Sequence, residues 1–202
     1  MLIATIITYN DYPLIKTCIE SIIDKVDRII CIDGRYTDFP EVDLDYSTDG
    51  TLEYLKSIDK VELMFRKGDE VSKRNFYLMQ VSNGDTILNL DADEVLIGSI
   101  PKLETDFGII EINDGVSNNR QKRATRFFEY KDGMEYKNCH YMLHYQDQEM
   151  NGLKRVFKPF TFIEIKDFYI QHNYHLRPGP RQYYKNIYYK QLIQKENKYR
   201  KQ

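Results

Sequence analysis

The chain has 202 residues, of which 42% are hydrophobic and 30% are charged, and its net charge at pH 7 is −2. This composition is typical of a soluble globular domain and excludes a disordered chain. No apolar run approaches the roughly 20 residues of a membrane-spanning helix, and the apolar N-terminus lacks the basic segment of a signal peptide. We therefore expect a cytoplasmic protein.

Charge is distributed unevenly along the chain. Residues 1–100 hold 10 basic and 19 acidic side chains, whereas residues 101–202 hold 19 basic and 12 acidic ones. An acidic first half suits a bound cation, and a basic second half suits an anionic ligand or surface. The cysteines Cys18, Cys31 and Cys139 have no metal-binding spacing, which agrees with a reducing compartment.

Four apolar runs in the first half predict strands, and amphipathic segments between them predict helices. The runs are almost continuously apolar, which is typical of strands covered on both faces. Strands that alternate with helices indicate a parallel sheet, whose ligands gather outside the carboxyl ends of the strands. The predicted strands are 4–8, 28–33, 61–65 and 86–91, and the predicted helices are 14–26, 52–58 and 70–81.

The second half has shorter and more mixed runs, which predict antiparallel or mixed strands. We find no internal repeat or linker, and we therefore expect one domain over residues 1–180. A helix rich in tyrosine and lysine should follow over residues 181–202. The strand-like runs are 107–114, 123–130, 137–145, 153–160 and 162–172.

Polar residues follow three of the four predicted parallel strands. Asn10 follows the first strand, Asp33 ends the second, and Asp91 ends the fourth, with Asp93 directly after it. Because the carboxyl ends of parallel strands share one edge of the sheet, we expect these side chains to lie together. Two neighbouring carboxylates favour a hard cation such as Mg²⁺ or Mn²⁺, and an acidic turn in solvent is the alternative. Glu94 either supports such a site or begins the next turn.

The order of these pieces resembles the glycosyltransferases of the GT-A fold, in particular the inverting enzymes of family 2. The matching segments cover about the first hundred residues. The resemblance implies a Rossmann-like α/β fold with a mostly parallel central sheet flanked by helices. It divides the domain into a nucleotide-binding half (1–100) and a mixed or antiparallel acceptor half (101–180). The segments are ATIITYNDYPLIKTCIESI, IDG with a later STDGT, SKRNFYLMQVSNGD and ILNLDADEVL.

The resemblance also implies roles for single residues. Asp93 would ligate Mn²⁺ or Mg²⁺, with Asp91 beside it and His172 as a further ligand. The metal would stabilise the charge that grows on the leaving nucleoside diphosphate. The residues implied to bind the nucleotide sugar are Thr8, Tyr9, Asn10, Asp33, Arg74 and Asp91.

An inverting transfer needs a base that takes the proton of the acceptor hydroxyl. Asp147 and Glu149 are the best candidates, because they occupy a polar turn between two strand-like runs; an ordinary polar turn is the alternative. The acceptor is expected to be a glycan, a protein or a lipid-linked molecule. The chain has no tryptophan, so it lacks the QxxRW signature of processive synthases, which favours transfer of a single sugar.

The tail over residues 181–202 has seven basic residues, one acidic residue and interleaved tyrosines. It either rests on an anionic membrane surface or packs its tyrosines on the domain with its lysines in solvent. A nucleic-acid partner is not expected, because the first half of the chain is acidic.

Two other functions stay open. HAD-type phosphotransferases also carry DxD after an apolar strand, but there it ends the first strand, whereas here it ends the fourth. A GT-A-like module that has lost catalysis would bind a nucleotide without transferring a sugar, so binding without transfer distinguishes it from an enzyme.

Overall fold

A computed structural model describes residues 1–37, 44–116, 120–137, 142–150, 160–177 and 179–199. Its first half contains the four predicted strands and three helices between them. The helices α1 and α3 end at residues 22 and 78, earlier than the predicted 26 and 81. The elements are β1 (Leu2–Thr8), α1 (Leu14–Ile22), β2 (Arg28–Asp33), α2 (Thr51–Lys56), β3 (Val61–Phe65), α3 (Glu70–Leu78) and β4 (Thr86–Asp91).

The second half adds strands to the same sheet and forms a small second sheet. Part of the predicted strand 137–145 and almost all of 153–160 lie outside the described residues. The strand β5 was not predicted, since it follows β4 after only two residues. The elements are β5 (Glu94–Gly98), β6 (Phe107–Asn113), β7 (Arg120–Glu129), β8 (Met134–Tyr136), β9 (Leu143–Tyr145), β10 (Gln148–Glu149) and β11 (Phe162–His172).

The main sheet has eight strands in the order β3-β2-β1-β4-β7-β6-β11-β5. Strands β1 to β4 run parallel, β7 is antiparallel to both of its neighbours, and β6 and β11 are again parallel. The predicted α/β class with a parallel first half and a mixed second half is therefore confirmed. No described helix is both long and apolar enough to cross a bilayer.

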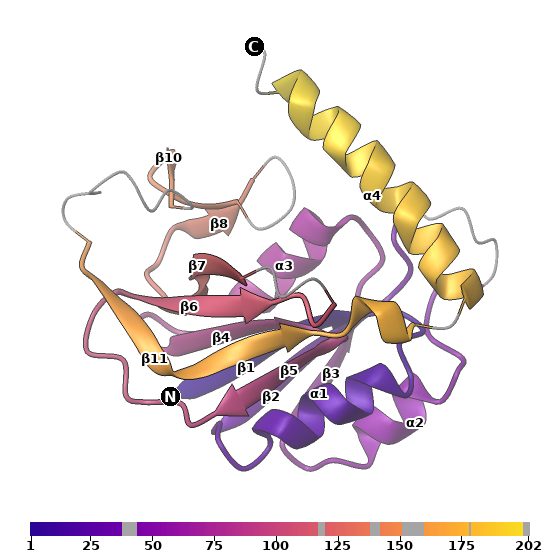
Figure 1. Ribbon diagram of the computed structural model, residues 1–202, viewed down its shortest axis with the longest axis horizontal. Coiled ribbons are helices and arrows are strands. Elements are labelled where there is room, and N and C mark those ends of the chain that lie inside the picture. Colours follow the sequence, from indigo (N-terminus) through magenta and orange to yellow (C-terminus); the bar gives the residue numbers. More distant parts are fainter. Residues whose placement is uncertain (38–43, 117–119, 138–141, 151–159, 178, 200–202) are drawn as a thin grey trace.

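Apolar side chains fill a core on each face of the sheet. One core packs α1 and α2 against β1, β2 and β4, and it also takes in β5 and β11. The other packs α3 and the strands β8 and β9 against the opposite face. Figure 1 shows these two layers, with α1 and α2 on one side of the sheet and α3 with β8 on the other. Strands β1, β2 and β4 are buried on both faces, which explains their continuous apolar runs.

The last elements start at the edge of the sheet where the parallel strands end. The 3-10 helix η1 (Tyr174–Leu176) follows β11 directly, and the helix α4 (Gly179–Tyr199) comes next. Figure 1 shows α4 beginning beside this edge and projecting beyond the body of the molecule. Tyr188 is buried in the core beside α3, whereas Tyr183 and Ile193 are 62% and 54% exposed.

Strand β5 returns across α1 and closes the far edge of the sheet by pairing with β11. Gly98 ends β5 with a φ of +110°, a region that side chains with a Cβ rarely adopt. A Cβ at this position would lie 2.2 Å from the carbonyl oxygen of Asp167 and 2.9 Å from the Cα of Phe168. The close approach of β5 and β11 at this point therefore requires glycine.

We expect Gly98→Ala to destabilise the protein more than Gly84→Ala does. Gly84 has a φ of +87°, but no atom lies within 4 Å of the position of its Cβ. Both substitutions carry the left-handed backbone strain of about 1–2 kcal/mol. Gly98→Ala adds a contact with backbone, for which overpacking costs of about 1–3 kcal/mol are usual. Urea unfolding of the two variants measures the difference, and equal losses of stability would contradict this account.

Candidate active site

The carboxyl ends of β1, β2 and β4 lie side by side. Thr8 at the end of β1 is the register partner of Asp33 in β2, and Ile7 is the partner of Asp91 in β4. The structure therefore brings the predicted strand-end residues to one edge of the sheet, as expected.

The residues after β1 are organised around Asp11. Its Oδ2 atom accepts hydrogen bonds from the Oγ1 hydroxyl of Thr8 and the backbone N–H of Tyr9, both at 3.1 Å. The hydroxyl of Tyr9 donates to the carbonyl oxygen of Leu44 at 2.8 Å. Thr8, Tyr9 and Asp11 are all buried, so they shape the end of β1 from inside the protein.

Asn10 and Asp33 both hold the segment that precedes α2. The backbone N–H of Asn10 donates to Ser47 Oγ at 2.7 Å, and Asn10 Oδ1 accepts from the N–H of Thr48 at 2.8 Å. Asp33 accepts two hydrogen bonds from Ser47, one from its N–H at 2.9 Å and one from its hydroxyl. Burial raises the pKa of Asp33 above its ordinary value, although the bonds from Ser47 oppose this shift.

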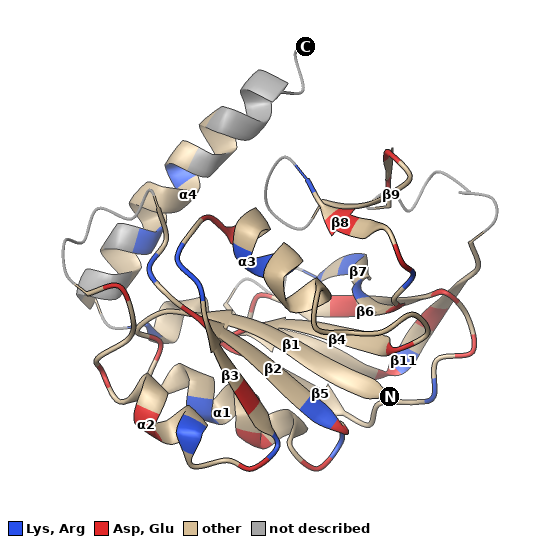
Figure 2. Ribbon diagram, turned by 180° about the vertical axis from the view of Figure 1, so that it is seen from behind, with Lys and Arg blue, Asp and Glu red and all other residues tan. Residues whose placement is uncertain are grey.

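Asp91 ends β4 between two buried guanidinium groups. Its Oδ1 atom lies 2.9 Å from Arg74 Nη2 of α3, and its Oδ2 atom lies 3.3 Å from Arg126 Nη2 of β7. Burial alone would raise the pKa of Asp91, but the two arginines overcome it and hold that pKa well below its usual range. Figure 2 shows basic residues on both α3 and β7.

Asp93 lies in the turn between β4 and β5 and has different partners. Its Oδ2 atom lies 2.5 Å from Arg177 Nη2 and 3.0 Å from His172 Nε2. The Nε atom of Arg177 also lies 4.0 Å from Asp11 Oδ1, so this arginine links the ends of β1 and β4. Burial would raise the pKa of Asp93, but Arg177 and His172 outweigh it and lower that pKa.

His172 ends β11, opposite Glu94 in the pairing of β11 with β5. Burial lowers the pKa of its imidazole, but the hydrogen bond and the charge of Asp93 outweigh burial and raise that pKa. The Nε2 atom of His172 faces Asp93 Oδ2. The carbonyl oxygen of Asp93 also accepts the backbone N–H of Asn173 at 2.8 Å.

Glu94 is a buried residue of the site and does not simply begin a turn. Its Oε2 atom accepts the backbone N–H of Asp91 at 2.7 Å, and its Oε1 atom lies 2.7 Å from Arg126 Nη2. Burial raises the pKa of Glu94, and Arg126 opposes that shift. Glu94 thus contacts Asp91 and Arg126 inside the protein and does not lie in a solvent-exposed turn.

A divalent metal is implied by the resemblance, and part of the predicted ligand set fits one. Among the described residues, Asp93 Oδ1 is buried and has no hydrogen-bond partner. His172 lies on the other oxygen of the same carboxylate. Mg²⁺ and Mn²⁺ are commonly held by one or two protein groups together with substrate phosphates. Asp91 fits less well, because a guanidinium group already lies on each of its oxygens.

The described residues contain no cluster of three or more histidine, cysteine, aspartate or glutamate side chains that could hold a metal. Asp93 and His172 would therefore need oxygen ligands from a bound substrate to complete the coordination of a cation.

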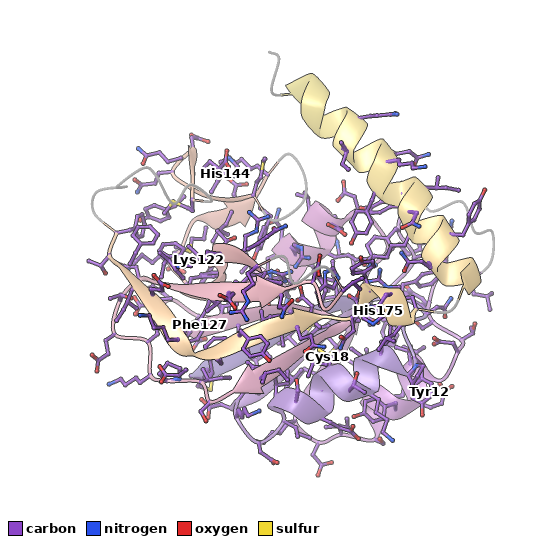
Figure 3. The ribbon with its side chains drawn as sticks, in the orientation of Figure 1. Tyr12, Cys18, Lys122, Phe127, His144 and His175 are labelled. Atoms are coloured by element: carbon purple, nitrogen blue, oxygen red, sulfur yellow. The ribbon has the colours of Figure 1, made fainter. Side chains whose placement is uncertain are left out.

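The structure does not bring Asp147 and Glu149 to this cluster. They belong to the β9–β10 hairpin, where Glu149 pairs with His144. Asp147 is 90% exposed at its side chain and forms an ion pair of 2.6 Å with Lys137, which lowers the pKa of Asp147. Figure 3 shows His144 in the β8–β10 part of the molecule, away from His175, which lies in η1 near the start of α4.

Asn89 and Arg126 are buried residues of the network for which the sequence predicted no role. Asn89 is the single polar residue in the run ILNL, and this pattern was a usable signal. Its Oδ1 atom accepts from Arg74 Nη1 at 2.8 Å. Arg126 gave no local signal, because Glu94 and Asp91 lie 32 and 35 positions before it in the sequence.

The chain is similar to several solved structures at low sequence identity. The structure of S. aureus TarS 1-349 has a TM-score of 0.42 and 18% identity, covering 58% of this chain and 37% of that one. The same region of TarS in complex with UDP-GlcNAc has a TM-score of 0.43 and 18% identity, covering 58% of this chain and 36% of that one. A further TarS structure has a TM-score of 0.41 and 18% identity, covering 66% of this chain and 23% of that one. The chain thus spans less than two fifths of each of these proteins.

No curated protein matches this chain. The family model described as Glycosyl transferase family 2 matches residues 4–155, which is more than half of the chain. The match spans β1 to β10 and includes Asp33, Asp91 and Arg126, so it confirms the GT-A resemblance that the sequence suggested. The chain belongs to Glycosyl transferase family 2.

Proposed function

We propose that this protein transfers a single sugar from a nucleotide diphosphate sugar, such as a UDP- or GDP-sugar, to an acceptor hydroxyl. The transfer would invert the anomeric centre and would use Mn²⁺ or Mg²⁺. The observation that carries the proposal is the meeting of Asp93, His172 and Arg177 at the carboxyl edge of the sheet in a family 2 chain. Ligands of parallel α/β sheets bind at this edge.

The nucleotide would lie against the end of β1 and the segment before α2. In this proposal Asn10 and Asp33 act mainly by holding Ser47 and Thr48, because their side chains already bond to that segment. Thr8 and Tyr9 fix the bend through Asp11. Arg74 supports Asp91 from inside the protein, since its guanidinium is buried on that carboxylate.

Asp93 and His172 would hold the metal, with Asp91 beside them. A bound Mn²⁺ or Mg²⁺ supplies positive charge that stabilises the leaving nucleoside diphosphate. Arg177 lies on Asp93 and supplies a second positive charge at the same place. Burial of these groups strengthens their electrostatic interactions, because little water screens them.

We expect Mn²⁺ to tighten the binding of UDP or GDP to the wild-type protein. In Asp93→Asn, we expect Mn²⁺ to leave the affinity for either nucleotide unchanged. Mutation of a residue that only orients a metal ligand usually costs about 10–100-fold in metal affinity or activity, and Asp93 is proposed as a ligand itself. Calorimetric titration of each nucleotide with Mn²⁺ and with EDTA measures it. Asp59→Asn, which removes an exposed carboxylate after α2, is the control and should bind like the wild type. Equal binding by Asp93→Asn and wild type would count against the metal site.

Transfer with inversion also needs a base for the acceptor hydroxyl, for which the sequence offers Asp147 and Glu149. A lost general base lowers kcat by roughly 10²–10⁴-fold. Because the β9–β10 hairpin lies apart from Asp93, we expect Asp147→Asn and Glu149→Gln each to keep kcat within about tenfold of wild type, well short of that loss. A fall in kcat with an unchanged donor KM in either variant would instead assign the base to that residue.

Nucleotide binding without transfer to any acceptor would favour a module that has lost catalysis.

We propose a glycan, a protein or a lipid-linked molecule as the acceptor. We also propose that α4 touches an anionic membrane surface from the cytoplasmic side. The helix projects from the body, and Figure 2 shows basic residues along its described part. Its exposed Tyr183 and Lys190 are suited to such an interface.

We expect the protein to sediment with vesicles that contain phosphatidylserine more than with phosphatidylcholine vesicles, and we expect salt to weaken this binding. Lys190→Gln should reduce the bound fraction, whereas Lys56→Gln, at the end of α2, should not. Equal sedimentation with both kinds of vesicle would refute the membrane contact and leave the transfer proposal intact.

A further inference from the structure

Glu94 and Arg126 form a buried ion pair directly behind Asp91. Glu94 begins β5 and Arg126 lies in β7, and their side chains are 1% and 5% exposed. The Nη2 atom of Arg126 lies 2.7 Å from Glu94 Oε1. The sequence left open whether Glu94 supports the site, and neither the sequence nor the family resemblance gave Arg126 a role.

The pair holds the end of β4 by its backbone and by its side chain. Glu94 Oε2 accepts the backbone N–H of Asp91 at 2.7 Å, and Arg126 Nη2 lies 3.3 Å from Asp91 Oδ2. Arg126 Nη1 also donates to the carbonyl oxygen of Asn89 at 3.2 Å. Both the position of the Asp91 backbone and the direction of its carboxylate therefore depend on these two residues.

Stability alone gives little reason for an ion pair at this place. Removing two charges from water is costly, and apolar residues of similar volume often replace a buried pair without loss of stability. What an apolar pair cannot supply is a directed contact with the N–H and the carboxylate of Asp91. Buried polar groups of this kind orient the residues that contact a ligand or a metal.

We propose that Glu94 and Arg126 are positioning residues for the donor site, which act through Asp91 and, two residues further on, through Asp93. The inference rests on the proposed function, because it assumes that the edge of β4 binds a nucleotide diphosphate. Neither side chain contacts the donor itself. Their role is to keep the turn between β4 and β5 in the one arrangement that presents Asp93 to the site.

The double variant Glu94→Met with Arg126→Met tests this role. If the pair only stabilises the fold, a well-packed apolar replacement that restores the urea midpoint should also restore nucleotide binding. If the pair positions Asp91, the midpoint should stay near that of wild type while the affinity for UDP or GDP with Mn²⁺ falls about 10–100-fold. Calorimetry and urea unfolding of the same preparations separate the two effects.

The control is a second pair of the same chemistry that lies away from the site. Arg28 and Glu62 join β2 and β3 through contacts of 2.5 and 2.6 Å. Arg28→Met with Glu62→Met should leave nucleotide affinity unchanged. The single variants Glu94→Gln and Arg126→Lys give a second test if the double variant does not fold. Glu94→Gln keeps the size of the side chain, Arg126→Lys keeps its charge, and each should weaken nucleotide binding.

The outcomes separate this inference from the function on which it rests. Wild-type affinity in Glu94→Met with Arg126→Met, or in both single variants, would overturn the positioning role and leave the proposed function in place. Failure of the wild type and of the Arg28 and Glu62 control to bind any nucleotide with Mn²⁺ would overturn both.

Discussion

Buried charges of opposite sign meet at the carboxyl ends of β1 and β4, and the arrangement of the site depends on their mutual compensation. The carboxylates come from the loop after β1, the end of β4, the turn that follows it and the start of β5. The guanidinium groups come from α3, β7 and the residue after η1. A buried carboxylate without a partner would be protonated or would draw in water. The elements that carry the arginines are thus tied to the strands that carry the acids. The acidic members are Asp11, Asp91, Asp93 and Glu94, and the basic members are Arg74, Arg126 and Arg177.

The network divides the DxD motif into two parts with different tasks. Asp91 faces inward, with a guanidinium group on each oxygen, and it is part of the scaffold. Asp93 faces Arg177 and His172, keeps one oxygen without a hydrogen bond among the described residues, and is the better ligand for a cation. The chain reverses between the two residues, so the rule that residues i and i+2 of an extended strand share a side does not apply here.

The second half of the chain completes a site that the first half begins. Strand β7 inserts antiparallel beside β4 and brings Arg126 behind Asp91. Strand β11 pairs with β5, and this pairing sets His172 opposite Glu94. The same pairing depends on Gly98, where β5 and β11 approach too closely for a side chain. Residues between 94 and 177 therefore influence a motif that ends at residue 93.

The sequence by itself determined the parallel strands, the helices between them and the edge at which Asn10, Asp33 and Asp91 meet, because local periodicity and strand order express these directly. Only the tertiary structure decided which charges pair. Arg126 and Glu94 are 32 residues apart, and no local pattern records such a contact. It also decided that the β9–β10 hairpin, which carries Asp147 and Glu149, lies away from the end of β4, because the position of a hairpin depends on packing between elements that are distant in the sequence.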